Sequence, residues 1–143
     1  MSTLSGMLAR RAGHIATITS LVGKFGTPLR SGYAASKHAL HGFFDSLRAE
    51  LWEQGVGISL ICPGFIHTNL TYAAVLGDGS PQNKMGDAQA HGYPATLCAE
   101  DILAGLAKDK EEFLVGGREC LGVYLKRFCP GLFSRMVRKA KVV

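Results

Sequence analysis

Tyr33 and Lys37 are four residues apart in the segment YAASK, and Ser20 lies 13 residues before the tyrosine. Residues four apart on an α-helix share one face, so the lysine ammonium would lie beside the phenol. A nearby cation stabilises phenolate, which makes a tyrosine usable as an acid and base near neutral pH. The pair could therefore move a proton. Since a YxxxK spacing also arises by chance, its meaning depends on the elements that carry it.

These elements follow an α/β pattern. The segment HIATITS is rich in Ile and Thr and predicts a strand that ends near Ser20. Residues 33–54 predict a long amphipathic helix, and ISLIC, residues 58–62, predicts a strand buried on both faces. The helix has apolar residues at three- and four-residue spacing, which are Leu40, Phe43, Phe44, Leu47 and Leu51. Such a βαβ unit would place Ser20 at the carboxyl edge of a parallel sheet, where ligands bind in open α/β folds.

The remaining segments extend this pattern on both sides. Leu4, Met7 and Leu8 have helical spacing before Gly13. Residues 71–94 are polar and rich in glycine, and we expect a long loop that acts as a lid or binding segment. Three further elements are expected: a helix over residues 99–109 with acids in its first turn, a short strand in EFLVGG, and helices on either side of Pro130 and Gly131.

Length and composition favour one globular domain. The chain has 143 residues, of which 47% are hydrophobic and 19% charged. Its four cysteines form no CxxC pair and no secretory signal segment is present, so we expect reduced thiols in an intracellular protein. No uninterrupted apolar run approaches the roughly 18 residues that span a bilayer. Nothing in the pattern points to nucleic acid.

Positive charge is concentrated at the C-terminal end. From Arg118 onward there are seven basic residues and one acid, so we set residues 118–143 apart as a basic helical tail. Two interpretations stay open: an ordinary solvated helix, or peripheral contact with an anionic membrane surface or acidic partners. His38, His41 and Asp45 could be drawn as metal ligands, but we expect solvated or capping histidines and no metal.

Three sequence elements together resemble the short-chain dehydrogenase/reductase family. They are Ser20, YAASK from Tyr33 to Lys37, and PGFIHT from Pro63 to Thr68, in the family's order and spacing. The resemblance implies an NAD(P)-dependent oxidoreductase that interconverts a carbonyl and a secondary alcohol, with NADP or NAD as cofactor. It also implies a partial Rossmann-like parallel sheet of about three strands with flanking helices. The branch it most resembles implies association with the endoplasmic reticulum or another membrane.

The resemblance assigns roles to the matching residues. Tyr33 would exchange a proton with the substrate oxygen, Ser20 would orient that oxygen, and Lys37 would bind the nicotinamide ribose and ease proton loss from Tyr33. Pro63, Gly64, Ile66 and Thr68 would line the nicotinamide. Cofactor binding would thus involve Tyr33 and Lys37 together with these four residues.

The resemblance covers the second half of the family's domain. The TGxxxGxG turn and the NNAG stretch of the first half do not occur in the chain, so we expect residues 1–143 to be a single incomplete domain without the N-terminal βαβ half. A truncated chain of this kind would bind cofactor poorly and associate readily. The alternative is therefore a catalytically inactive interaction module that pairs with full-length relatives as a homo- or hetero-oligomer.

Overall fold

The structure is a computed structural model, which describes residues 3–68 and 90–140. In chain order the elements are α1 (Thr3–Arg10), β1 (Gly13–Ile18), the 3-10 helix η1 (Leu21–Gly23), α2 (Ser31–Glu50), β2 (Val56–Pro63), β3 (Ile66–His67), β4 (Tyr93–Pro94), α4 (Ala95–Leu106), β5 (Glu112–Val115), the 3-10 helix η3 (Arg118–Cys120), α5 (Leu121–Phe128) and α6 (Pro130–Val137). No helix in these two ranges is both long enough and apolar enough to cross a membrane.

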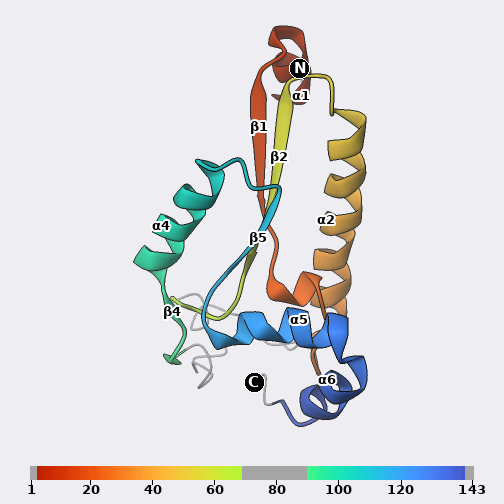
Figure 1. The fold of residues 1–143 in the computed structure, drawn as a ribbon, viewed down its shortest axis with the longest axis vertical. Coiled ribbons are helices and arrows are strands. Elements are labelled where there is room, and N and C mark those ends of the chain that lie inside the picture. The colour runs from red at the N-terminus through yellow and green to blue at the C-terminus, as the bar shows by residue number, and fades with distance from the viewer. Residues whose placement is uncertain (1–2, 69–89, 141–143) are drawn as a thin grey trace, which may run out of the picture.

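A parallel three-stranded sheet forms the centre of the fold, with β2 between β1 and β5. The register places Ile18 opposite Ile61 and Pro63 opposite Val115, so the three strands end at one edge of the sheet. Helix α2 lies on one side of the sheet and α4 on the other (Figure 1). The expected α/β class, with about three parallel strands and flanking helices, is confirmed.

Strand β2 is buried on both faces, as its uninterrupted apolar sequence predicts. Leu60, Ile61 and Cys62 are fully buried. Ile61 packs in a cluster with residues of α4, whereas Cys62 packs in a cluster with η1, α5 and α6. Neighbouring residues of one strand therefore serve two different cores, and the strand has no face left for solvent.

Helix α2 begins two residues before the expected start and ends four residues before the expected end. Phe44 and Leu47 pack on the sheet, but Phe43 is 61% exposed, so its assignment to the packed stripe is wrong. The chain then turns at Gly55, which has a φ of +71° and leaves no room for a Cβ beside the backbone of Arg11. Only glycine fits this conformation without strain.

Helix α4 begins at Ala95, four residues before the expected start. Pro94 precedes it with φ −59°, a value that suits the entry to a helix. Glu100 and Asp101 therefore lie beyond the first turn, and the expected first-turn acids are wrong. Most of the loop expected over residues 71–94 lies outside the described residues. Its last two residues form β4, which pairs in parallel with β3.

Helices α5 and α6 confirm the expected helical segments around Pro130. The break falls at Cys129, and Pro130 is the first residue of α6, where its missing N–H costs nothing. Phe133 is 5% exposed and its ring meets that of Phe25 edge-on, with centroids 5.1 Å apart. The inner faces of both helices are thus anchored to the core.

Candidate active site

Tyr33 and Lys37 lie in the first two turns of α2 and share one face. The Lys37 ammonium is 5.7 Å from the centroid of the Tyr33 ring, and it donates a hydrogen bond of 3.4 Å to the carbonyl of Ile18. Ile18 is the last residue of β1. The lysine therefore fixes the start of α2 to the carboxyl end of the first strand, while the phenol ring stays 43% exposed.

Ser20 follows β1 by two residues and caps η1. Its Oγ accepts a hydrogen bond of 3.2 Å from the Val22 N–H, and its hydroxyl points to the Pro63 carbonyl at 3.5 Å. This second contact is at the limit for a hydrogen bond. The serine is thus held at the ends of β1 and β2, and its hydroxyl proton has no strong acceptor there.

The segment from Pro63 to Thr68 continues along the same edge of the sheet. Pro63 ends β2, and the Gly64 N–H donates to the carbonyl of Val115 at the end of β5. The Ile66 side chain packs into the core beneath α4, so it is committed to the interior. Thr68 is exposed and comes directly after β3. Of the predicted residues, Ser20 donates a hydrogen bond to the Pro63 carbonyl at the end of β2. Lys37 donates to the Ile18 carbonyl at the end of the neighbouring strand β1.

Glu119 also belongs to this edge, and sequence reasoning missed it. Its Oε1 accepts hydrogen bonds from the backbone N–H of Gly117 at 3.0 Å and of Phe65 at 3.3 Å. The carboxylate fills the space where a Cβ on Gly64 would lie. It links the loops after β2 and β5. Because Glu119 and Phe65 are 54 residues apart, no local pattern could have predicted the contact.

A buried polar cluster lies directly behind the predicted site. Thr19 donates to the carbonyl of Ile61 at 3.0 Å, and its Oγ1 lies 3.2 Å from Nε2 of His41 and 3.3 Å from Sγ of Cys62. On its other side His41 places Nδ1 3.3 Å from Oε2 of Glu112. That contact lacks hydrogen-bond geometry, so its attraction is electrostatic. The helical phase of His41, one turn after Lys37, could have revealed this position.

Burial controls the protonation of this cluster. Desolvation raises the pKa of the Cys62 thiol to about 11, so the thiol is protonated and a poor nucleophile at neutral pH. The pKa of His41 is lowered, first because burial disfavours the charged ring and then because Lys24 repels it, although Glu112 acts in the opposite direction. The neutral imidazole is the favoured form near neutral pH.

His41 differs from the expectation of a solvated histidine, because it is 7% exposed. His38 is exposed as expected, with Nδ1 2.8 Å from the Ala34 carbonyl. One ligand atom each from His41, Cys62 and Glu112 lies within 4.8 Å of the others, and these atom types suit Zn²⁺. However, Lys24 places its ammonium 2.9 Å from Oε2 of Glu112, where it would repel a metal ion. We interpret the cluster as a structural contact between α2 and the sheet.

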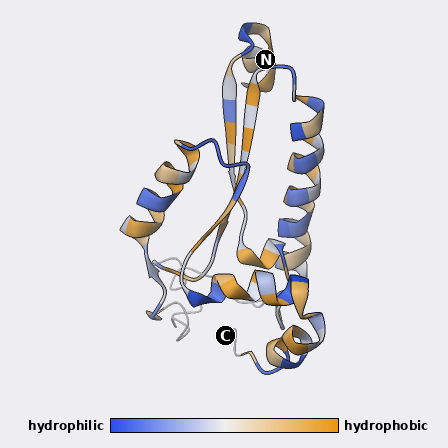
Figure 2. Cartoon of the chain, viewed as in Figure 1, coloured by the Kyte–Doolittle hydropathy of each residue, from blue (hydrophilic) through white to orange (hydrophobic). Residues whose placement is uncertain are grey.

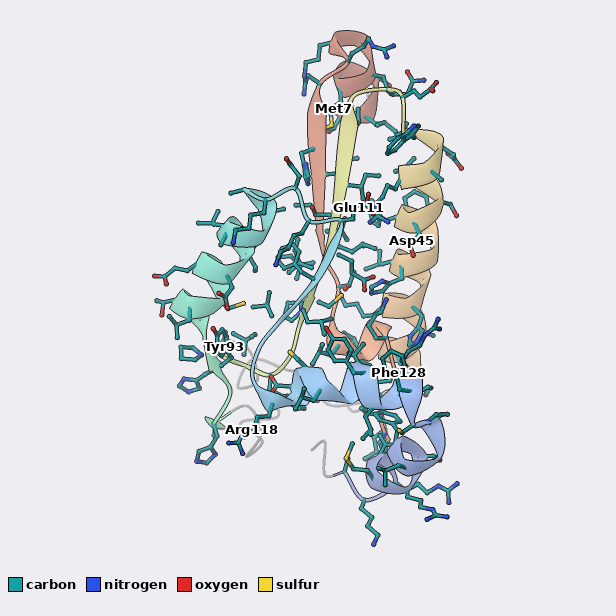
Figure 3. The ribbon with its side chains drawn as sticks, viewed as in Figure 1. Met7, Asp45, Tyr93, Glu111, Arg118 and Phe128 are labelled. Carbon is teal, nitrogen blue, oxygen red and sulfur yellow. The ribbon has the colours of Figure 1, made fainter. Side chains whose placement is uncertain are left out.

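Two cavities flank this edge of the described structure. The larger one, about 740 Å³, is lined by residues 110–114 of the β5 region with Val123 and Tyr124, and contains none of the predicted site residues. The smaller one, about 480 Å³, lies between Phe65, residues 91–94 and residues 117–119. Tyr93 and Arg118 mark its position in Figure 3. Because it adjoins Gly64 and Glu119, the smaller cavity is the one next to the candidate site.

The comparisons with known proteins agree with one another. The family model "short chain dehydrogenase" matches residues 1–77. The chain is 44% identical to "Dehydrogenase/reductase SDR family member 7B" of Bos taurus and 41% identical to that of Mus musculus, in each case over 94% of this chain and 42% of the relative. A "Dehydrogenase/reductase SDR family protein 7-like" of Drosophila melanogaster is 36% identical over 97% of the chain. The chain thus spans less than half the length of these relatives.

Solved structures share the fold. A short chain dehydrogenase from Burkholderia cenocepacia in complex with NADP superposes with a TM-score of 0.72 over 95% of this chain and 52% of that one, at 18% identity. A short chain dehydrogenase/reductase from Burkholderia phymatum in complex with NAD gives 0.68 over 87% and 50%, at 22% identity. The expected Rossmann-like arrangement is therefore confirmed.

Proposed function

Because this chain belongs to the short chain dehydrogenase family, we propose that it supplies the catalytic half of an NAD(P)-dependent oxidoreductase that interconverts a carbonyl and a secondary alcohol. The observation that carries the proposal is the placement of Tyr33, Lys37 and Ser20. Two hydrogen bonds connect Lys37 and Ser20 to the ends of neighbouring parallel strands, and Tyr33 lies beside Lys37 with an exposed ring. Ligands of open α/β folds bind at this edge.

The residues present fit the nicotinamide end of such a cofactor. The Lys37 ammonium has three donors and makes a long bond to Ile18, so donors remain for ribose hydroxyls. Gly64 follows β2 beside the smaller cavity, and its missing side chain leaves room for the Glu119 carboxylate that joins the loops after β2 and β5. Residues 63–68 would line the nicotinamide, with Thr68 contributing from its exposed position and Ile66 through its backbone. Either NADP or NAD is compatible with these contacts.

Proton transfer is assigned to the phenol of Tyr33. The Tyr33 hydroxyl donates its proton to the substrate oxygen during reduction and takes it back during oxidation, and the nearby Lys37 cation stabilises the phenolate. Ser20 donates its hydroxyl proton to the same oxygen, because the competing Pro63 carbonyl is 3.5 Å away. The bound nicotinamide cofactor supplies or accepts the hydride. Positioning of the small-molecule carbonyl or alcohol then completes the site.

Cofactor titration tests the proposal. The 143-residue chain is titrated with NADPH and with NADH while nicotinamide fluorescence is followed, and the variants Lys37→Met and Lys24→Met are compared. We expect weak but saturable binding, since the chain lacks the TGxxxGxG turn, and we expect Lys37→Met to weaken it further. Lys24→Met should leave it unchanged, because Lys24 contacts Glu112. Equal loss in both variants, or saturable binding by neither variant nor parent, contradicts the proposed site.

A second candidate function follows from the exposed surfaces of the sheet. Strand β1 is an edge strand of the described sheet, and Ile18 at its end is 57% exposed. Edge strands and exposed apolar side chains favour pairing with another chain. We therefore retain an interaction module that pairs with longer relatives as the alternative. Sedimentation at several concentrations separates the two: a stable complex with a relative, without cofactor binding by the chain itself, favours the module.

A further inference from the structure

Helices α5 and α6 carry an outer apolar surface in addition to the inner faces that pack on the core. In each helix the outer residues recur at three- or four-residue spacing and lie on one side. They are between 50% and 76% exposed. This outer surface consists of Leu121, Tyr124 and Phe128 of α5 and Leu132 and Met136 of α6. Helices that only covered the core would need no second apolar face.

Basic side chains border this surface. Arg127 follows Tyr124 by one turn of α5, and Arg135 follows Leu132 by three residues on α6. Lys139 lies in the turn just after the end of α6, three residues after Met136. All three are exposed. No acidic residue occurs anywhere in residues 120–143, whereas six lysines and arginines do. Figure 2 shows the resulting alternation of hydrophobic and hydrophilic residues along both helices. Each helix thus presents exposed apolar residues with exposed basic residues nearby and without acids.

We propose that the outer surface of α5 and α6 docks on the surface of an anionic lipid bilayer. Helices that lie in a membrane interface combine an apolar face with lysine and arginine at its border. The apolar residues would enter the boundary between headgroups and acyl chains, and the cations would meet anionic headgroups. An acidic protein would match the charge, but it would not require five exposed apolar side chains next to it.

A reporter at the junction of the two helices gives a direct test. Cys129 lies between α5 and α6 and is exposed, whereas Cys62 and Cys98 are buried. Cys120 is half-buried, so it is replaced by serine before a polarity-sensitive fluorophore is attached to Cys129. The labelled chain is mixed with vesicles of phosphatidylcholine alone or of phosphatidylcholine with phosphatidylserine. We expect a blue shift and co-flotation only with the anionic vesicles, and weaker binding as salt is added.

Trp52 provides an internal control within the same sample. It is the single tryptophan, is 80% exposed, and follows the end of α2. Figure 1 shows that end of α2 on the far side of the molecule from α5 and α6. Its emission should stay constant while the Cys129 fluorophore shifts. A shift of Trp52 emission alone would overturn the proposed orientation.

Matched variants separate charge from apolar contact. Arg135→Gln with Lys139→Gln should weaken binding to the anionic vesicles by on the order of 20-fold, since each basic residue near such a surface contributes about fivefold. Arg10→Gln with Lys108→Gln removes the same charge from other exposed positions and should change binding much less. Phe128→Ser should weaken binding by about tenfold or more, whereas Leu103→Ser, at similar exposure on α4, should not.

Three outcomes overturn the proposal. The first is the absence of co-flotation, and the second is equal binding to neutral and anionic vesicles. The third is a parent chain that self-associates and a Phe128→Ser variant that is monomeric, with no vesicle binding by the parent or the variant. That result would make the surface an interface between copies of the chain. Circular dichroism of every variant verifies folding, which the exposed positions of the substitutions favour. None of these results depends on cofactor binding.

Discussion

Two sets of polar side chains come from neighbouring positions at the ends of β1 and β2 and on α2, and the second set also includes Glu112, the exposed first residue of β5. The outer set is Ser20, Tyr33 and Lys37, and the inner set is Thr19, His41, Cys62 and Glu112. Thr19 and Ser20 are neighbours in sequence, and Lys37 and His41 are one helical turn apart. The same short segments of chain therefore present one set to the proposed site and the other to the interior.

The two sets differ in how firmly they are held. Thr19 of the inner set has neighbours at 3.0 to 3.3 Å, and Thr19, His41 and Cys62 are buried. In the outer set, Lys37 and Ser20 donate only long hydrogen bonds of 3.4 and 3.5 Å to backbone carbonyls, and Tyr33 stays exposed. Ser20 is buried like the inner set and also accepts a bond of 3.2 Å from the Val22 N–H. Buried polar groups must be satisfied within the protein, whereas groups at a reaction site must stay available. The inner set positions α2 so that the outer set can act.

The largest effect is expected for Tyr33→Phe. Loss of the phenolic proton should reduce turnover of a carbonyl substrate with NADPH by about 10²- to 10⁴-fold, the usual range for general acid catalysis. The melting temperature should stay unchanged, because Phe keeps the ring and the hydroxyl contributes no hydrogen bond to the core. Steady-state kinetics and thermal melting measure the two effects. Tyr124→Phe, at an exposed position of α5 that does not line the smaller cavity, is the matched control; equal turnover in Tyr33→Phe and the parent would falsify the assigned role.

The next largest effect concerns stability. His41→Ala removes the ring that contacts Thr19, Cys62 and Glu112, and it should lower the free energy of unfolding by about 2 to 3 kcal/mol. Urea unfolding measures the change. His38→Ala, three residues earlier on the same helix, removes an exposed ring and should cost less than about 0.5 kcal/mol. Similar losses in the two variants would show that the inner set contributes no more than a surface contact.

Sequence reasoning named the residues of the outer set and did not find the inner set, for a physical reason; the roles of the outer residues stay predictions. YxxxK spacing and the strand that ends near Ser20 are local, so helix and strand geometry alone place these residues at one edge. The inner set depends on tertiary packing: Glu112 reaches Lys24 across 88 residues, and His41 is buried only because η1 and β2 lie against α2. Glu119 was missed for the same reason. Both helices begin earlier than predicted. Pro94 directly precedes α4, which was expected to start beside its acids, and Arg30 directly precedes α2, which was expected to start at Tyr33.

A smaller effect is expected from pH, and it should be confined to the inner set. The pKa of His41 in the folded chain is below its ordinary value of 6.5, mainly through burial and then through repulsion by Lys24, against the attraction of Glu112 and Asp45. The unfolded chain therefore binds more protons as the pH falls below 6.5, and the free energy of unfolding decreases. Above that pH this contribution is fully present.

Urea midpoints on both sides of pH 6.5 measure this dependence. His41→Gln cannot take up the proton, so the difference between the parent and this variant should shrink as the solution becomes more acid. A constant difference across the range would mean that His41 does not titrate with unfolding. Turnover should not follow the same profile, because the His41 ring contacts Thr19, Cys62 and Glu112 and none of the three outer residues.

The smallest effect is expected for Lys24→Met, which separates the two sets most sharply. Lys24 and Glu112 form an ion pair of 2.9 Å whose side chains are 27% and 33% exposed, so its loss should cost at most about 1 kcal/mol. Removing this cation also removes one cause of the lowered pKa of His41, so the loss of stability below pH 6.5 should become smaller than in the parent. Cofactor affinity should stay the same, because Lys37 is intact. Fluorescence titration of NADPH checks this, and a weakened affinity would mean that the inner set tunes the reaction site as well as supporting it.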